Sequence, residues 1–361
     1  MATQRFLTAK TGALELLKRK PALRFEGRTR AQWLAWRRRF QASLIRLMGP
    51  VPKPAPLRVR RVERVRCAGY TREKILFNPD SFSTISAYVL IPDSIRRGER
   101  RPAVLCAHGH GEGKDELLGL VRVKHVESAD PYKDMAAKLA RDGFVVIAPD
   151  WRSFGERRDA ADYIGHWKGE HGADGCDLSY MLYGYFGYQL LTLDVADARR
   201  CVDYLLWRKD VDPRRIGAIG CSFGGTMTMY AAALDRRIKA AVISSYLSTL
   251  GDAIGDRGRG NVCGSQFLFG LRTIGDIADV AGLIAPRPCM VQIGRHDQCF
   301  IESDALAAFK HLRRIYRAAG ASKQLELDHF DGSHEFDPPA ALDFLARHLG
   351  SARPRTGVRG Y

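Results

Sequence analysis

A serine between two glycines is the residue of this sequence best placed to act as a nucleophile. Ser222 lies in the stretch Gly-Cys-Ser-Phe-Gly at 220–224, after the apolar residues 216–219 and before the Ala- and Met-rich residues 226–234. An apolar run followed at once by helix formers predicts a strand, a sharp turn and a helix. The glycines let neighbouring main chain approach where a Cβ would not fit. The turn then presents the hydroxyl at a helix N-terminus, where the Phe223 amide and the helix dipole can stabilise an oxyanion.

A catalytic serine needs a histidine that accepts its proton, and that histidine needs a carboxylate that holds its tautomer and stabilises its cation. Asp297 follows the predicted strand 289–294, and His334 follows the predicted strand 324–328. Because the loops after parallel strands meet at one edge of a sheet, these two side chains and Ser222 can converge. We therefore predict a catalytic triad of Ser222, Asp297 and His334.

Three other residues compete for the roles of acid and base. His329 and Asp331 lie beside His334, but the Gly-Ser dipeptide directly before His334 predicts a mobile turn that can carry an imidazole over the serine. His296 adjoins Asp297 and is expected to point elsewhere. The sequence thus favours Asp297 and His334 over these neighbours.

A glycine-rich turn at 108–113 follows the apolar residues 103–107. A turn at that end of a parallel strand lies where such sheets bind ligands, and its amides can supply a second donor to an oxyanion hole. Its two histidines, His108 and His110, are also of a type that binds metals. A zinc site needs a third protein ligand, however, and the sequence has no H-x-x-H or H-E-x-x-H motif. We therefore expect no metal and no other cofactor.

The elements that must position these residues follow an α/β pattern. From residue 102 onward apolar runs alternate with helical runs, which predicts a doubly wound, mostly parallel sheet. Before them, residues 59–65 and 75–91 predict strands at an antiparallel edge, the second interrupted by a turn at Asn-Pro-Asp. The sequence therefore predicts one α/β domain over 58–350.

An N-terminal helical extension, residues 1–57, precedes this domain. Its hydrophobic residues recur at helical spacing and stop at Gly49 and Pro50, after which the Pro-rich residues 50–56 form a stiff connector. The apolar face carries Trp33, Trp36, Phe40, Leu44 and Leu47. We expect this face to pack on the main domain or on a second subunit, which would give a homo-oligomer. A helix lying on a membrane surface is the alternative.

Two insertions, 151–189 and 245–288, are expected to form a small cap or rim over the active face. The first insertion is rich in Gly and Tyr, which predicts a long loop whose aromatic rings line a pocket. We therefore predict that Tyr183 and Tyr185 contact the substrate. Packing of these rings on the next helix is the alternative. Asp150, just before the first insertion, is expected to brace a loop.

Composition sets the remaining bounds. The chain has 361 residues, 45% of them hydrophobic, and can bury a large core as one α/β domain with additions. No apolar stretch approaches the roughly 20 residues of a membrane span, and no secretory signal is recognised. Eight cysteines scattered singly indicate reduced thiols in a cytoplasmic protein. The net charge is +17, but no nucleic-acid-binding module accompanies it, so we expect no nucleic-acid partner. Residues 351–361 are expected to form a basic C-terminal tail.

Over residues 70–349 the chain resembles serine hydrolases of the α/β-hydrolase superfamily, and within it the dienelactone-hydrolase-like and acetyl-xylan-esterase-like branch. The matching stretches are His-Gly-His-Gly at 108–111, Gly-Cys-Ser-Phe-Gly-Gly at 220–225, Gly-Arg-His-Asp at 294–297 and Gly-Ser-His at 332–334. The resemblance implies the α/β-hydrolase fold, the triad roles given above, and the main-chain amides of His110 and Phe223 as oxyanion donors.

Two departures from the family pattern limit what the resemblance implies. Dienelactone hydrolases proper carry cysteine as nucleophile, whereas this chain has Ser222, with Cys221 one place earlier. Acetyl xylan esterases have a glutamine or similar residue after the serine and are often hexameric. Phe223 stands at that place here, so neither acetyl-sugar specificity nor hexamer formation is implied.

These observations predict a metal-independent carboxylic-ester hydrolase that acts on a small-molecule ester, either an acyl ester or a lactone, through an acyl-enzyme on Ser222. A catalytically silent binding protein on the same fold is one alternative, because a fold alone does not confer activity. A peptidase or thioesterase that uses the same triad is another.

Overall fold

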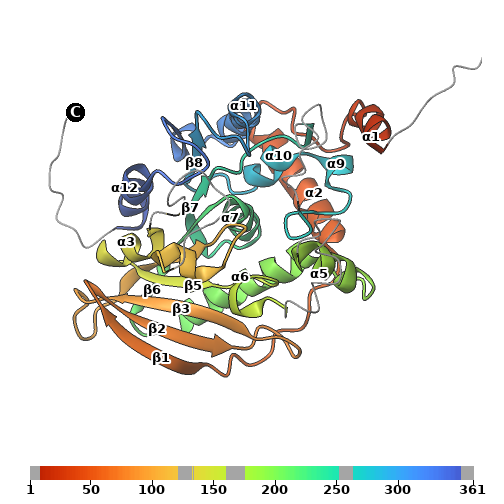
Figure 1. Ribbon diagram of the computed structural model, residues 1–361. Helices are drawn as coiled ribbons and strands as arrows, with labels where there is room; N and C mark the ends of the chain where they lie inside the picture. The colour runs from red at the N-terminus through yellow and green to blue at the C-terminus, as the bar shows by residue number, and fades with distance from the viewer. Residues whose placement is uncertain (1–8, 121–131, 133, 160–174, 252–262, 351–361) are drawn as a thin grey trace, which may run out of the picture.

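The structure is a computed structural model, and it describes residues 9–120, 132, 134–159, 175–251 and 263–350 (Figure 1). The expected basic tail at 351–361 lies outside these ranges, as do parts of both expected insertions. Within the described part of the chain, no helix is both long and apolar enough to cross a membrane.

A nine-stranded sheet of order β1-β2-β3-β5-β4-β6-β7-β8-β9 forms the centre of the molecule. The strands are β1 (Arg60–Cys67), β2 (Tyr70–Phe77), β3 (Ile85–Pro92), β4 (Arg101–Ala107), β5 (Val145–Pro149), β6 (Val211–Cys221), β7 (Ile238–Ser244), β8 (Cys289–Gly294) and β9 (Leu325–Phe330). The pairs from β1 through β3 to β5 are antiparallel, and every pair from β5 through β4 to β9 is parallel. The predicted mostly parallel α/β sheet with an antiparallel edge is therefore confirmed.

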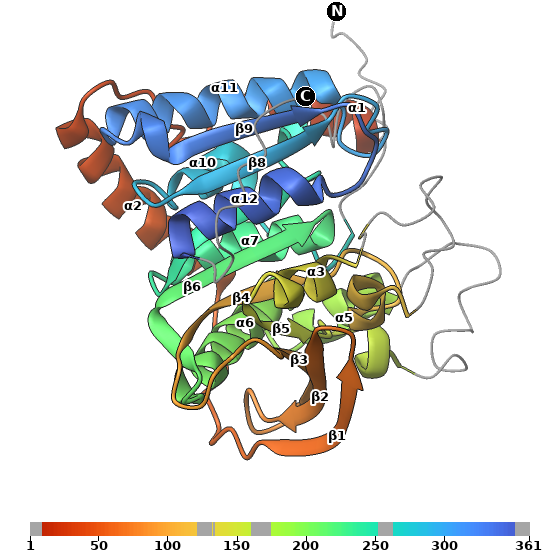
Figure 2. The same ribbon diagram turned by 90° about the vertical axis from the view of Figure 1, so that its left-hand side faces the viewer.

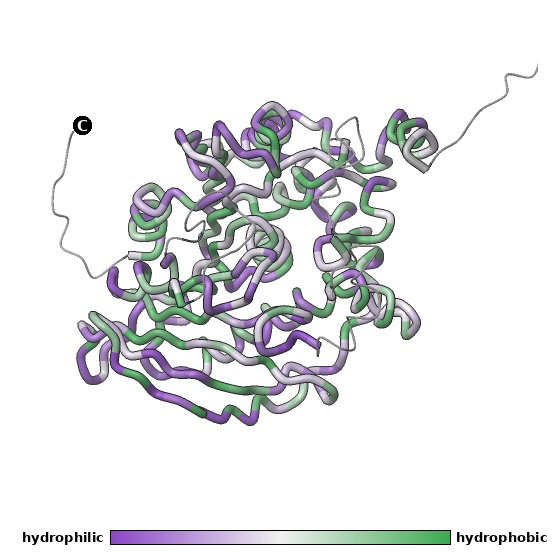
Figure 3. Tube along the Cα trace, viewed as in Figure 1, coloured by the Kyte–Doolittle hydropathy of each residue, from purple (hydrophilic) through white to green (hydrophobic). Residues whose placement is uncertain are grey.

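Helices cover both faces of this sheet (Figure 2). They are α1 (Ala9–Leu17), α2 (Arg30–Met48), α3 (Met135–Arg141), α5 (Gly175–Gly184), α6 (Leu190–Trp207), α7 (Phe223–Leu234), α9 (Leu271–Ile274), α10 (Ile277–Gly282), α11 (Glu302–Ala318) and α12 (Pro338–Leu349). Alternate residues of β4 enter different cores: Leu105 packs in the core with α6 and α7, whereas Val104 and Cys106 pack in the core with α3 and α12. This alternation follows from the two-residue period of a strand that is buried on both faces. Figure 3 shows the resulting concentration of hydrophobic residues in the inner strands.

The N-terminal helix α2 packs on the main domain, against α9 and α11. Its first turn is closed by a capping box in which the Thr29 side chain accepts from the Gln32 amide. The Trp36 indole donates to the Leu23 carbonyl at 2.7 Å and stacks on Phe40 with ring centroids 5.2 Å apart. The apolar face predicted for this helix therefore packs against other helices of the same chain.

The two insertions contain more regular structure than the sequence indicated. Residues 175–184, expected as part of a long loop, form helix α5, and the second insertion contains α9 and α10. The Tyr180 ring meets the Phe267 ring edge-on at 5.3 Å, so the two insertions pack on each other. This contact between aromatic rings stabilises a helix that its Gly and Tyr content disfavours, which is why local propensity misjudged it.

A buried ion pair joins the loop after β4 to the end of β5. The Lys114 ammonium lies 2.7 Å from an Asp150 oxygen and 2.8 Å from a Glu156 oxygen, and the Lys114 and Asp150 side chains are 1% and 0% exposed. Asp150 also accepts the main-chain amides of Lys114 and Glu156. Asp150 thus braces the loops on both sides, in agreement with the role expected from the sequence.

Lys114→Met should lower the free energy of unfolding by about 3–5 kcal/mol, because it leaves the Asp150 carboxylate buried without its counter-ion. Arg158→Met is the matched control, since the Arg158–Glu112 pair is 39% exposed at both side chains and an exposed pair contributes about 0–1 kcal/mol. Urea denaturation of both variants measures the difference. Equal losses would contradict a bracing role for the buried pair.

Candidate active site

The backbone at Ser222 has the strained geometry expected of a nucleophile elbow. Ser222 has φ 60° and ψ −123°, a conformation that non-glycine residues rarely adopt, and it stands between β6 and α7. A Cβ at Gly220 would lie 2.1 Å from the Gly224 carbonyl oxygen, and one at Gly224 would lie 2.2 Å from the Ala107 carbonyl oxygen. Only glycine fits at these two positions, as the sequence predicted. The close contact with Ala107 also brings the end of β4 against the start of α7.

Two main-chain segments border the serine. Phe223 is the first residue of α7, so its amide lacks an intrahelical acceptor and lies at the positive end of the helix dipole. The loop after β4 is held in place by His108, whose Nδ1–H donates to the Gly109 carbonyl at 2.7 Å and whose Nε2 accepts the Trp151 amide at 3.1 Å. Burial lowers the pKa of His108 to about 4, which keeps the ring neutral in this bracing role. His110, the second predicted donor, follows in the same loop.

His334 and Asp297 lie in hydrogen-bond contact. The Nδ1 atom of His334 is 3.0 Å from one Asp297 oxygen and 3.1 Å from the other. Asp297 is 5% exposed and also accepts the amides of Cys299 and Phe300 at 2.7 and 2.9 Å, while the Phe300 ring stacks on the imidazole at 5.7 Å. These contacts fix both the carboxylate and the ring. With Nδ1–H donating to Asp297, Nε2 is left as the basic atom.

The competing residues engage other partners. The His329 Nε2 atom lies 2.6 Å from a Glu302 oxygen, and the exposed His296 Nε2 lies 2.8 Å from an Asp331 oxygen. Among the described residues, the hydrogen bonds of His334 are those to Asp297, and none joins it to Ser222. Such contacts often tighten only when substrate is bound. The structure brings together the acid and base predicted from the sequence, and the role of the serine stays a prediction.

Cys221 precedes the serine but is fully buried, and burial raises the pKa of its thiol. A thiol that stays protonated is a poor nucleophile. The side chain belongs to the core with α3 and α12, on the face of the sheet away from α7. The geometry therefore favours Ser222 over Cys221 as the reacting residue.

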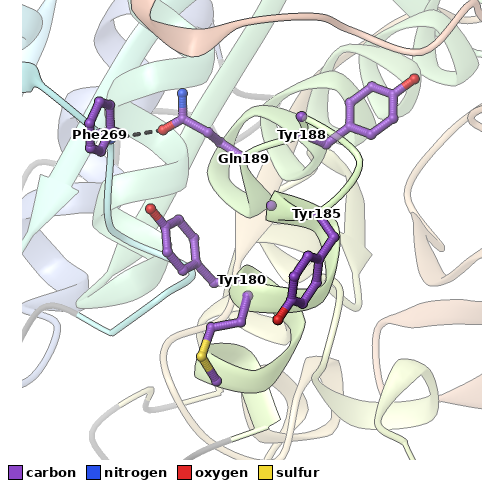
Figure 4. Close-up of a pocket in the computed structure, with 8 residues that line it drawn as sticks. Tyr180, Tyr185, Tyr188, Gln189 and Phe269 are labelled. Atoms are coloured by element: carbon purple, nitrogen blue, oxygen red, sulfur yellow. Dashed lines mark hydrogen bonds between the residues drawn. The ribbon is translucent and has the colours of Figure 1, made fainter.

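The two tyrosines predicted to contact the substrate have different environments, and Figure 4 shows that of Tyr185. Tyr185 is 87% exposed and lines an open pocket of about 550 Å³ with Tyr180, Tyr188 and Phe269. Tyr183 instead packs against the core, with the Arg152 guanidinium 5.8 Å from its ring centroid. Of the described residues that line this pocket, none belongs to the predicted triad. The pocket is thus adjacent to the second insertion rather than centred on the serine.

Sequence reasoning missed a cluster beside the loop after β4. His110, Cys176 and Cys263 place an imidazole nitrogen and two sulfurs within 4.8 Å of one another. The hydrogen bond from Cys176, together with the nearby His110, holds the pKa of the Cys263 thiol well below its usual value. The two cysteines stand singly in the sequence, far apart and outside any C-x-x-C pattern, so no spacing signal could have joined them.

Comparisons with known proteins place these observations in a family. The model of the Abhydrolase family matches residues 1–341. YtaP of Bacillus subtilis (strain 168), named as a hydrolase, is 28% identical over 289 residues, which cover 78% of this chain and 88% of YtaP. A proposed acetyl xylan esterase from Bacteroides fragilis NCTC 9343 is similar in structure, with a TM-score of 0.73, 22% identity and coverage of 91% of this chain and 84% of that one. A glucuronoyl esterase from Solibacter usitatus is also similar in structure, with a TM-score of 0.61 and 15% identity, and the match covers 89% of this chain and 94% of that one.

Proposed function

The chain belongs to the Abhydrolase family, and from that premise we propose that it is a serine esterase that cleaves a small carboxylic ester or a lactone. The observation that carries this proposal is the contact of His334 with Asp297 after β9 and β8, at the same sheet edge as the strained Ser222 after β6. Serine, aspartate and histidine in this order and at these strand ends are the parts that acyl transfer requires.

In the proposed first step, His334 Nε2 takes the proton of the Ser222 hydroxyl as the oxygen attacks the ester carbonyl. Asp297 holds the ring in the tautomer that leaves Nε2 free and stabilises the imidazolium that forms. The negative charge that develops on the carbonyl oxygen is stabilised by the amides of Phe223 and His110. His334 then gives its proton to the leaving alcohol, and the acyl group stays on Ser222.

In the second step, water attacks the acyl-enzyme while His334 accepts one of its protons, and the same amides stabilise the second tetrahedral intermediate. The acid product leaves when the serine oxygen regains its proton from His334. No chemical step of this cycle uses a metal ion or an organic cofactor.

The substrate class is proposed from the fold relatives as well as from the site. The structural neighbours include proteins named as acetyl xylan esterases and glucuronoyl esterases. These names support an ester substrate in preference to a peptide substrate. Turnover of the pure protein against a panel of esters, lactones, thioesters and short peptides tests this. Turnover of peptides alone would favour the peptidase alternative, and a folded protein without turnover would favour a binding protein.

Tyr185→Ala should raise KM for bulky esters several-fold and leave the free energy of unfolding within about 0.5 kcal/mol, because the ring is exposed at the pocket. Tyr183→Ala is the matched comparison and should instead lower stability by about 1–3 kcal/mol, because that ring is packed. Kinetics across the ester panel and urea denaturation separate the two effects. If Tyr185→Ala leaves every KM unchanged, this pocket does not contribute to substrate binding.

A further inference from the structure

His110, Cys176 and Cys263 form a compact set of metal-binding atoms contributed by three separate parts of the chain. His110 lies in the loop after β4, Cys176 in the first turn of α5, and Cys263 in the second insertion before α9. The three ligand atoms lie within 4.8 Å of one another, and His110 Nε2 is 3.3 Å from Cys176 Sγ. Around a tetrahedral zinc ion, with bonds of about 2.0–2.3 Å, neighbouring N and S ligand atoms lie about 3.5–3.8 Å apart. The distance between His110 and Cys176 is close to that spacing, and Cys263 Sγ lies within 4.8 Å of both atoms.

Contacts of the residues next to the two cysteines hold these segments together independently of the thiols. The amide of Gly264, the residue after Cys263, donates to an Asp177 oxygen at 2.6 Å, and Asp177 directly follows Cys176. A Cβ at Gly264 would lie 2.7 Å from the Cys176 carbonyl oxygen, so only glycine permits this approach. The site is therefore preorganised by contacts that do not require an ion.

The imidazole is positioned in a similar way and remains accessible. The Phe154 ring meets the His110 ring edge-on at 5.0 Å, which limits its rotation. Cys176 is 1% exposed, Cys263 is half-buried and His110 is exposed, so an ion can enter from the histidine side. One buried and one half-buried sulfur ligand, with an accessible nitrogen ligand, suit a binding site that is open on one side.

From this geometry we propose that His110, Cys176 and Cys263 bind a zinc ion that ties the loop after β4 to both insertions. Two thiolates and an imidazole are soft and borderline ligands, which select zinc over magnesium or calcium. Three protein ligands leave the fourth position to water or another small ligand. The sequence predicted no metal because its glycine-rich turn offers only His108 and His110, whereas the fold brings in two distant cysteines. The proposal does not depend on the esterase activity, because the ion takes no part in the acyl-transfer steps.

The test is the metal content and the cobalt spectrum of the full-length protein, purified under reducing conditions without chelator. We expect about one zinc per chain by elemental analysis. After removal of zinc, added Co²⁺ should give a thiolate-to-cobalt charge-transfer band, and added Zn²⁺ should abolish it. Cys176→Ser and Cys263→Ser should lose bound zinc, whereas Cys67→Ser, which alters a cysteine at the antiparallel edge of the sheet, should retain it.

The wild-type measurements remain decisive even if a serine variant fails to fold. A folded wild type with no bound zinc and no cobalt band would overturn the proposal. So would zinc that stays bound in both serine variants.

Discussion

Ser222→Ala should reduce the turnover of any ester substrate by about 10⁶-fold and abolish covalent labelling by a fluorophosphonate probe. The probe forms a tetrahedral adduct and therefore depends on the same base and the same oxyanion donors as the acylation step. The strained backbone of Ser222 at the start of α7 presents its hydroxyl at the elbow tip, so the substitution removes the group that the probe is expected to label. Labelling followed by peptide mapping, together with steady-state kinetics, measures both effects.

Cys221→Ala is the matched control for this experiment, since it changes the adjacent residue and leaves the serine. Cys221 is fully buried with a raised thiol pKa, so its loss should leave labelling and turnover largely intact. An adduct on Cys221, or a folded wild type that resists the probe, would refute the serine-esterase proposal.

The elbow was predictable because its constraints are local. A serine between glycines, after an apolar run and before helix formers, admits few backbone solutions, and the contacts at Gly220 and Gly224 match the reason given for those glycines. The pairing of Asp297 with His334 was accessible for a related reason. Each follows a strand of the parallel series, and the parallel order places the two loops at the same edge of the sheet.

Other features could not be predicted because they depend on contacts between distant segments. Helix α5 is stabilised by packing of Tyr180 on Phe267, and neither residue identifies its partner in the sequence. The cluster of His110, Cys176 and Cys263 likewise exists only because two insertions fold back to the loop after β4. Local propensity and motif spacing carry no information about such contacts, so the sequence indicated a loop and the absence of metal.

Asp297→Asn should lower kcat by about 10⁴-fold with little change in the fold, because it reverses the tautomer of His334. One oxygen of Asp297 accepts the amides of Cys299 and Phe300, and the asparagine carbonyl can keep both of these bonds. The new amide group then faces His334 Nδ1 and donates to it. The ring must carry its proton on Nε2, where it can no longer accept the proton of Ser222.

Asp331→Asn tests the same chemistry at the competing carboxylate, which lies exposed against His296 rather than His334. It should leave kcat and KM unchanged within about twofold, since an exposed pair of this kind contributes little. Kinetics of both variants on one ester, with circular dichroism to verify folding, provide the comparison. A larger loss for Asp331→Asn than for Asp297→Asn would mean that the contact of His334 with Asp297 is structural, and the acid of the triad would have to be sought elsewhere.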